Sequence, residues 1–91
     1  MKYPVAIHKD KDSCFGATVP DIPGCFSAGD SLDRAINNVQ EAISTHLELL
    51  SLENKLSPIP SVVEVYIKDP DYRGATWAYI DLSTLEKSFV I

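Results

Sequence analysis

The sequence has little of what disulfide scaffolds, zinc centres and nucleic-acid-binding surfaces require. Its two cysteines, Cys14 and Cys25, form no Cys-x-x-Cys pair, and its two histidines, His8 and His46, are not spaced to complete a zinc site. Eight Lys and Arg face thirteen Asp and Glu, so the net charge is -5. The basic residues are scattered, which argues against nucleic-acid binding and suits an encounter with a basic partner.

Long apolar runs are also missing. None approaches the roughly 18 residues of a membrane span, and the N-terminal stretch MKYPVAIHKD lacks the apolar core of a signal peptide. We therefore expect a cytoplasmic protein that meets no membrane. The length of 91 residues suits a single domain whose core needs no disulfide and no metal.

Signatures of common enzymes are absent: there is no Gly-rich dinucleotide motif, no P-loop and no HExxH. The acidic residues fall in turns and at a helix start, where turn and cap chemistry already explains them. A Cys25–His8 dyad stays open if the strands that carry them are neighbours. His46 lies on an apolar helix stripe, as a core-edge histidine does. We predict no catalytic residue, no metal site and no cofactor.

The N-terminal quarter predicts a β-hairpin. Residues 2–9 alternate as a strand with one buried face, and Pro4 belongs near the start of that strand or on a sheet edge. Residues 10–13 form a polar turn, and residues 14–19 alternate again. The buried side of the first strand consists of Tyr3, Val5 and Ile7.

The stretch VPDIPGC predicts a tight turn into a third strand. Pro20 and Pro23 fix the backbone, Gly24 supplies conformational freedom, and residues 25–28 form a short strand that Gly29 ends. If this turn closes a hairpin, Cys25 faces Thr18 rather than Cys14. A disulfide is then not expected.

Residues 30–50 show the clearest pattern, that of an amphipathic helix. Asp30 or Ser31 offers an N-cap oxygen, and Asp33 suits the helix dipole. Apolar residues recur at helical spacing for five turns. They are Leu32, Ala35, Ile36, Val39, Ala42, Ile43, Leu47 and Leu50.

The C-terminal part reads as loops and strands. Residues 51–61 and 68–75 are loops, residues 76–82 are a strand, and residues 62–67 are either a strand or an extended arm or edge. Strands followed by one helix that covers one face of the sheet indicate an α+β fold. The open edges of such a sheet favour a homo-oligomer, a dimer or tetramer.

Order and spacing of these pieces resemble the HicB antitoxin family. The matching segments are YPV, FGATVPDIPGCFSAGDSLDRAINNVQEAISTHLELL, SPIPSVVE and a closing strand with Trp77, which span Tyr3 to Leu82. The resemblance implies a partial, degenerate RNase H-like fold, an antiparallel β-β-β-α-β sheet without the nuclease carboxylates. The motif residues are Pro20, Asp21, Pro23, Gly24, Gly29 and Ser31.

The resemblance also implies a function: binding a HicA-like toxin, a small basic protein that cleaves mRNA, and masking its active site. Candidate contacts lie in the 68–73 loop and on the exposed helix face. Tyr72 or Trp77 would be an aromatic anchor, with plain core packing the alternative for Trp77. The candidate toxin-binding residues are Asp69, Asp71, Tyr72, Arg73, Glu41 and Glu48.

Family members often carry a C-terminal DNA-binding domain that represses their own operon. We expect residues 1–82 to form the HicB-like domain and residues 83–91 to be a tail, the start of a domain that is not evident here. The apolar end Phe89–Ile91 favours a chain that continues. Operator DNA would then be bound only through that further part. The alternatives are a minimal RNase H-type nuclease and a non-catalytic oligomeric module that binds a ligand or a protein.

Overall fold

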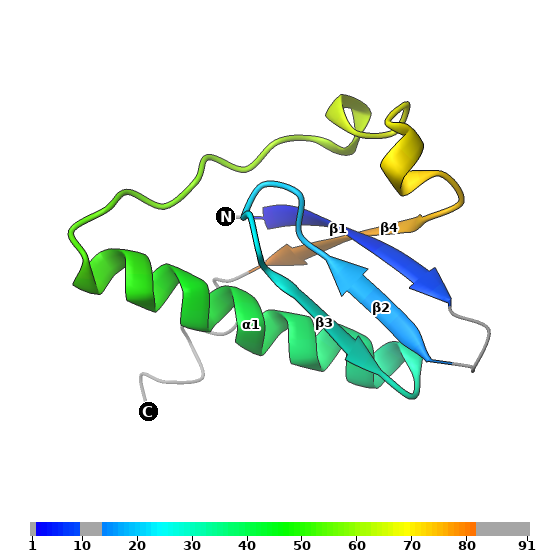
Figure 1. Cartoon of the computed structure of the whole chain (residues 1–91), viewed down its shortest axis with the longest axis horizontal. Coiled ribbons are helices and arrows are strands. Elements are labelled where there is room, and N and C mark those ends of the chain that lie inside the picture. The colour runs from blue at the N-terminus through cyan, green and yellow to red at the C-terminus, as the bar shows by residue number, and fades with distance from the viewer. Residues whose placement is uncertain (1, 10–13, 82–91) are drawn as a thin grey trace.

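The computed structural model describes residues 2–9 and 14–81, and within them it confirms an α+β fold (Figure 1). The helices of these ranges lack the combined length and apolar character that crossing a membrane requires. Leu82, the predicted turn 10–13 and the predicted tail 83–91 lie outside the described residues. The elements are β1 (Lys2–Lys9), β2 (Phe15–Thr18), β3 (Phe26–Gly29), α1 (Leu32–Leu52), the short 3-10 helices η1 (Val63–Val65) and η2 (Pro70–Tyr72), and β4 (Thr76–Asp81).

The strands form one antiparallel sheet in the order β3-β2-β1-β4. The predicted hairpin of β1 and β2 is confirmed, with Ala6 opposite Thr18. Pro4 lies near the start of β1, as expected. Its pairing there is with β4 alone, because the pairing with β2 begins only at Ala6. The missing N–H of a proline is tolerated at such a position.

The helix α1 covers one face of the sheet and confirms the predicted amphipathic pattern. Ala35, Val39 and Ile43 are completely buried, and Val39 and Ile43 pack in one core with side chains of β1 and β2. Burying a side chain of this size stabilises a fold by about 1.5–3 kcal/mol. The core on this face consists of Tyr3, Val5, Ile7, Ala17, Val19, Ile22, Cys25, Val39, Ile43 and Ile80.

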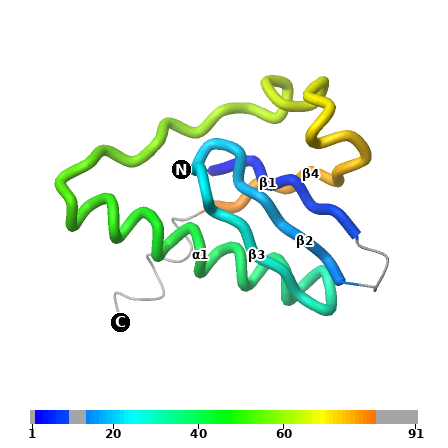
Figure 2. Tube along the Cα trace, viewed as in Figure 1, coloured from blue at the N-terminus to red at the C-terminus, as the bar shows by residue number. Residues whose placement is uncertain are grey.

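The expectation of one buried face on β1 is wrong, because Pro4 and Ala6 are buried as well. The segment that links α1 to β4, residues 54–75 (the arm), returns over the face opposite to the helix (Figure 2). The rings of Tyr66 and Tyr72 in this arm pack on Trp77 of β4, which lies opposite Ala6. A central strand with cover on both faces buries both of its alternating sets of side chains.

Residues 62–67 do not join the sheet. Val63–Val65 form η1, with Val65 N donating to Val62 O at 3.1 Å and Tyr66 N donating to Val63 O at 2.8 Å. The β-branched composition favoured a strand, but the contacts of Tyr66 with the rest of the chain override this weak local preference. Of the two predictions for residues 62–67, the arm outside the sheet is closer to the structure than the strand. The backbone of this arm is helical here and not extended.

The register around Cys25 also differs from expectation. Thr18 pairs with Phe26, and Val19 N donates to Cys25 O at 3.0 Å, so Cys25 lies opposite Val19. The hairpin between β2 and β3 is therefore shifted by one residue. Both cysteines are free thiols, Cys14 exposed and Cys25 buried.

Candidate functional site

Backbone hydrogen bonds close the turn between β2 and β3. Ile22 N donates to Val19 O at 3.1 Å, and Cys25 N donates to Ile22 O at 3.0 Å. Gly24 has φ of 79°, a left-handed conformation that glycine adopts without strain. The Ile22 side chain is buried in the core and anchors the turn. Pro20, Pro23 and Gly24 thus fix the shape of a turn that presents the side chain of Asp21.

Asp21 links this turn to the arm. Its Oδ2 accepts a hydrogen bond from Ser61 N at 2.7 Å, and its Oδ1 accepts one from the Tyr66 hydroxyl at 2.5 Å. Both carboxylate oxygens are therefore engaged by residues 40 and 45 positions away in the sequence. Hydrogen bonds to a charged group are among the stronger ones in proteins. Asp21 fixes the arm to the sheet.

Three aromatic rings pack beneath the arm. The Tyr66 and Trp77 rings are stacked with centroids 6.2 Å apart, and the Tyr72 ring meets both edge-on at 5.9 and 5.6 Å. Burial raises the pKa of Tyr66, and so does its hydrogen bond to Asp21. Burial, followed by the nearby charges of Asp69 and Asp71, raises the pKa of Tyr72. Both phenols therefore stay neutral up to alkaline pH.

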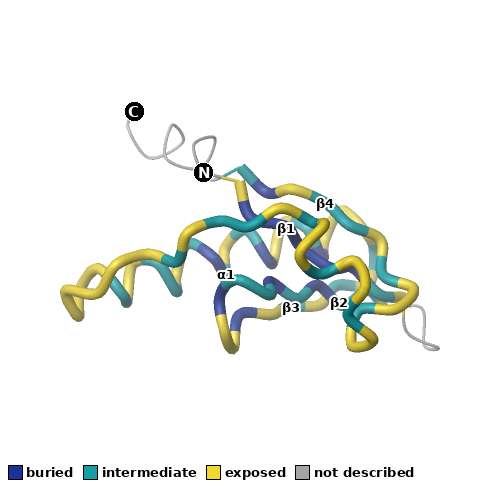
Figure 3. Tube along the Cα trace, turned by 90° about the horizontal axis from the view of Figure 1, so that it is seen from above, coloured by how far each residue is buried: buried dark blue, intermediate teal, exposed yellow. Residues whose placement is uncertain are grey.

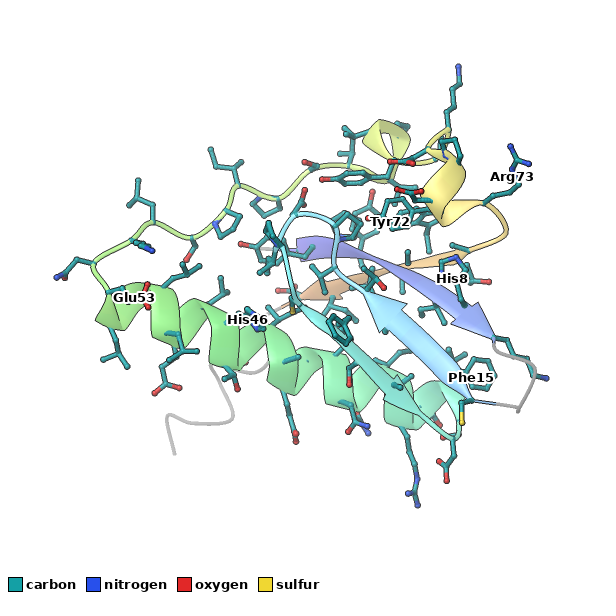
Figure 4. The ribbon with its side chains drawn as sticks, in the orientation of Figure 1. His8, Phe15, His46, Glu53, Tyr72 and Arg73 are labelled. Carbon is teal, nitrogen blue, oxygen red and sulfur yellow. The ribbon has the colours of Figure 1, made fainter. Side chains whose placement is uncertain are left out.

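The predicted contacts in the 68–73 loop gather on η2. Asp69 caps this short helix, its Oδ1 accepting from Asp71 N at 2.9 Å. Tyr72 packs inward on Trp77, whereas Arg73 points away from the sheet (Figure 4). Asp71 and Arg73 are exposed, and Asp69 is half-buried. The ring of Tyr72 is thus used within the chain, and its role as a partner anchor stays a prediction.

The other two predicted contacts lie elsewhere. Glu41 and Glu48 are exposed on α1, on the opposite side of the sheet from η2. The exposed positions around Glu41 are polar, among them Asn37, Asn38 and Thr45, whereas Leu49 and Leu52 are exposed near Glu48. The six candidate residues therefore form two separate surfaces, one on η2 and one on α1.

Gly29 and Ser31 set the start of α1. A Cβ on Gly29 would lie 2.5 Å from Ala35 N, so this position requires the close approach that glycine permits. Ser31 is the N-cap, and its hydroxyl oxygen accepts a hydrogen bond from Arg34 N at 3.2 Å. The sequence allowed either Asp30 or Ser31 as the N-cap, and in the structure Ser31 takes this position.

The open question of a Cys25–His8 dyad is settled by the topology. The strand β2 lies between β1 and β3, so the strands that carry these residues are not neighbours. His8 lies opposite Gly16, whereas Cys25 lies opposite Val19. Gly16 and Val19 are three positions apart, so the two side chains are also displaced along the strand direction. Burial also raises the pKa of the Cys25 thiol, which disfavours a reactive thiolate.

The other histidine and the carboxylates do not gather into a metal site in the described ranges. His46 is a core-edge residue as predicted, its Nδ1 lying 3.0 Å from the Ala42 carbonyl oxygen. Across residues 2–9 and 14–81, no three His, Cys, Asp or Glu side chains converge to hold a metal ion.

The sequence did not reveal a set of exposed apolar side chains on the arm. Val62, Val65 and Ile67 are 54%, 62% and 57% exposed. Figure 3 shows the arm as a series of exposed and half-buried residues, while β1 is largely buried. The apolar run of residues 62–67 was the available signal. Its composition indicated a strand, whereas the run does not join the sheet.

Comparison with known proteins identifies relatives of this chain. Residues 3–89 match a family model described as the HicB-like antitoxin of bacterial toxin–antitoxin systems. A 14.9 kDa protein of the rep-hol intergenic region of Haemophilus phage HP1 is 40% identical over 82 residues, which are 90% of this chain and 61% of the phage protein. The chain thus spans about three fifths of that relative's length.

Two solved structures share the fold. The N-terminal domain of the Burkholderia pseudomallei antitoxin HicB is 45% identical with a TM-score of 0.81, over 89% of this chain and 96% of that domain. A chain of the HicA3 and HicB3 toxin–antitoxin complex is 33% identical with a TM-score of 0.72, over 89% of this chain and 96% of that chain.

Proposed function

The chain belongs to the HicB-like antitoxins of bacterial toxin–antitoxin systems, and from this membership we propose that it binds a small, basic, mRNA-cleaving HicA-like toxin and masks its active site. The observation that carries the proposal is the likeness to a chain of a toxin–antitoxin complex. The role is non-catalytic and cytoplasmic, and the fold would be a degenerate relative of RNase H.

The mechanism we propose is competitive occlusion. A toxin that binds RNA through a basic surface presents positive charge to this chain, whose net charge is -5. Opposite charges accelerate encounter and favour the correct orientation. A stable interface buries about 1,200–2,000 Å² in total, enough to exclude RNA from a small toxin. The candidate contacts are Asp69, Asp71, Tyr72 and Arg73 around η2, with Glu41 and Glu48 on α1.

Further features of the family are part of the proposal. Residues 1–82 would be the toxin-binding domain, and residues 83–91 would begin a DNA-binding part through which a longer form represses its own operon. The length of the phage relative supports a longer form. Self-association through a sheet edge is supported by Phe26, which is 70% exposed on the edge strand β3.

The test is inhibition of RNA cleavage. A HicA-like toxin from the same genome is incubated with labelled mRNA and increasing amounts of the chain. We expect cleavage to stop near stoichiometric amounts, and the association rate to fall as salt is raised, because screening weakens charge steering. An unrelated ribonuclease is the control and stays active. Full cleavage with an excess of the chain, together with no measurable binding, would overturn the proposed function.

A further inference from the structure

The helix η1 presents three different sides because a 3-10 helix repeats every three residues. Val63 and Tyr66 share the inner side, and both are half-buried. Val62, Glu64, Val65 and Ile67 are all exposed. The arm therefore holds one side against the sheet and exposes three apolar side chains in a row of six residues.

The inner side of the arm is firmly attached. Val63 N donates to the Tyr79 hydroxyl at 2.9 Å, and the Tyr66 hydroxyl and Ser61 N both donate to Asp21. These bonds fix the backbone before, within and after the first turn of η1. A surface that is already ordered loses less conformational entropy when it binds a partner.

The arm carries exposed acidic side chains as well as the exposed apolar ones. Glu64 and Asp71 are exposed, and within residues 2–9 and 14–81 neither forms an ion pair. The arm also carries Lys68 and Arg73, both exposed. An apolar centre with a polar, solvent-accessible rim is the usual make-up of a protein interface.

Two other surfaces fit a basic partner less well. The exposed helix side is polar around Glu41, and its exposed apolar side chains, Leu49 and Leu52, lie near Glu48 at the end of α1. Leu56 and Ile59 are 94% and 88% exposed near the end of α1, but the nearby carboxylate of Glu53 is neutralised by Lys55 at 3.1 Å. The first surface has its apolar side chains at one end only, away from Glu41, and on the second surface the Glu53 carboxylate is already paired with Lys55.

We propose that the outer side of the arm, with Val62, Val65 and Ile67 at its centre and Glu64 and Asp71 at its rim, is the surface that docks on the basic face of the toxin. This inference rests on the proposed function and selects the η2 side over the α1 side. Asp21 is a positioning residue for this surface: it touches no toxin and holds the arm in place through Ser61 and Tyr66.

The test compares two pairs of substitutions. Val62→Ser/Val65→Ser removes the apolar centre, and Leu56→Ser/Ile59→Ser removes two larger and more exposed apolar side chains from the start of the arm, before the proposed surface. Binding to a cleavage-inactive HicA-like toxin from the same genome is measured by calorimetry. We expect the first pair to weaken binding by about 10-fold or more and the second pair by less than about 2-fold.

The outcomes separate this inference from the proposed function. If the unmodified chain binds and inhibits the toxin but Val62→Ser/Val65→Ser binds equally well, the docking surface lies elsewhere and the inference is overturned while the antitoxin function stands. If the unmodified chain does not bind, both are overturned. Far-ultraviolet circular dichroism of all variants verifies that they are folded, and Val62→Ser suits the N-cap position of η1.

Discussion

On one face of the sheet α1 buries Val39 and Ile43 completely, whereas on the other face the arm has no fully buried residue. The helix side is held by apolar packing over a continuous core. The arm side is held by hydrogen bonds to Asp21 and Tyr79 and by one cluster of three rings. The helix side therefore supplies most of the apolar core, and the arm side leaves apolar groups exposed, which the proposed docking of a toxin would cover.

The largest loss of stability is expected when the packing of α1 on the sheet is disrupted. Ile43→Ala leaves a cavity in the core, so we expect the free energy of unfolding to fall by about 2–5 kcal/mol. Ile59→Ala on the arm, where the side chain is 88% exposed, should change it by less than about 0.5 kcal/mol. Urea unfolding followed by circular dichroism measures both. Similar losses in the two variants would contradict the comparison.

A second prediction concerns the contact of α1 with the end of β3. Gly29→Ala places a methyl group 2.5 Å from Ala35 N, and the backbone must shift to admit it. We expect a loss of about 1–3 kcal/mol. Gly16→Ala is the matched control, because its nearest neighbour, His8 O, would lie at 4.0 Å. Equal thermal stability of the two variants would show that the helix is not packed this closely on the sheet.

A third prediction concerns a substitution that loosens the arm and leaves the helix side intact. Asp21→Ala removes two hydrogen-bond acceptors, and we expect it to lower stability by about 1–2 kcal/mol. The amide of Ser61 should exchange faster, and Trp77 fluorescence should shift to longer wavelength, while helix content is unchanged. Asp30→Ala, which removes an exposed ion pair with Arg34, is the control and should leave both signals as they are. Unchanged Ser61 exchange in Asp21→Ala would refute the positioning role.

The smallest effect is a pH dependence confined to alkaline solution. The pKa of Tyr66 is raised in the folded state, so its contribution to stability is complete below its unfolded pKa of about 10 and is lost as the pH rises through the folded pKa. We expect stability to decline above pH 10, and to decline less steeply in Tyr66→Phe. The slope is reduced and not abolished, because the pKa of Tyr3 and Tyr72 is raised too. Identical slopes would contradict the burial of this phenol.

Much of the helix side could be predicted from the sequence. Periodicity placed α1 to within about two residues, and it assigned Ala35, Val39 and Ile43 to the core. The alternation of β1 gave Tyr3, Val5 and Ile7 correctly. These features depend on local repetition, which a sequence displays directly.

The arm side could not be predicted in the same way. The hydrogen bonds of Asp21 join residues that are 40 and 45 positions apart in the sequence. An aspartate is common in turns, so its presence in the turn motif needed no further explanation at the level of sequence. The run 62–67 had a strand-like composition, but the packing of Tyr66 on Trp77 decided its conformation. The sequence also gave no sign that Glu41 and Asp71 lie on opposite sides of the sheet.

The most direct test maps the toxin on the surface of the chain by nuclear magnetic resonance. The isotope-labelled chain is titrated with a cleavage-inactive HicA-like toxin, and methyl and amide shifts are followed. We predict the largest shifts at Val62, Val65 and Ile67 and across η2, with small shifts at Glu41 and Glu48. Large shifts along the exposed side of α1, with the arm unperturbed, would contradict the division of the two faces into a stabilising side and a binding side.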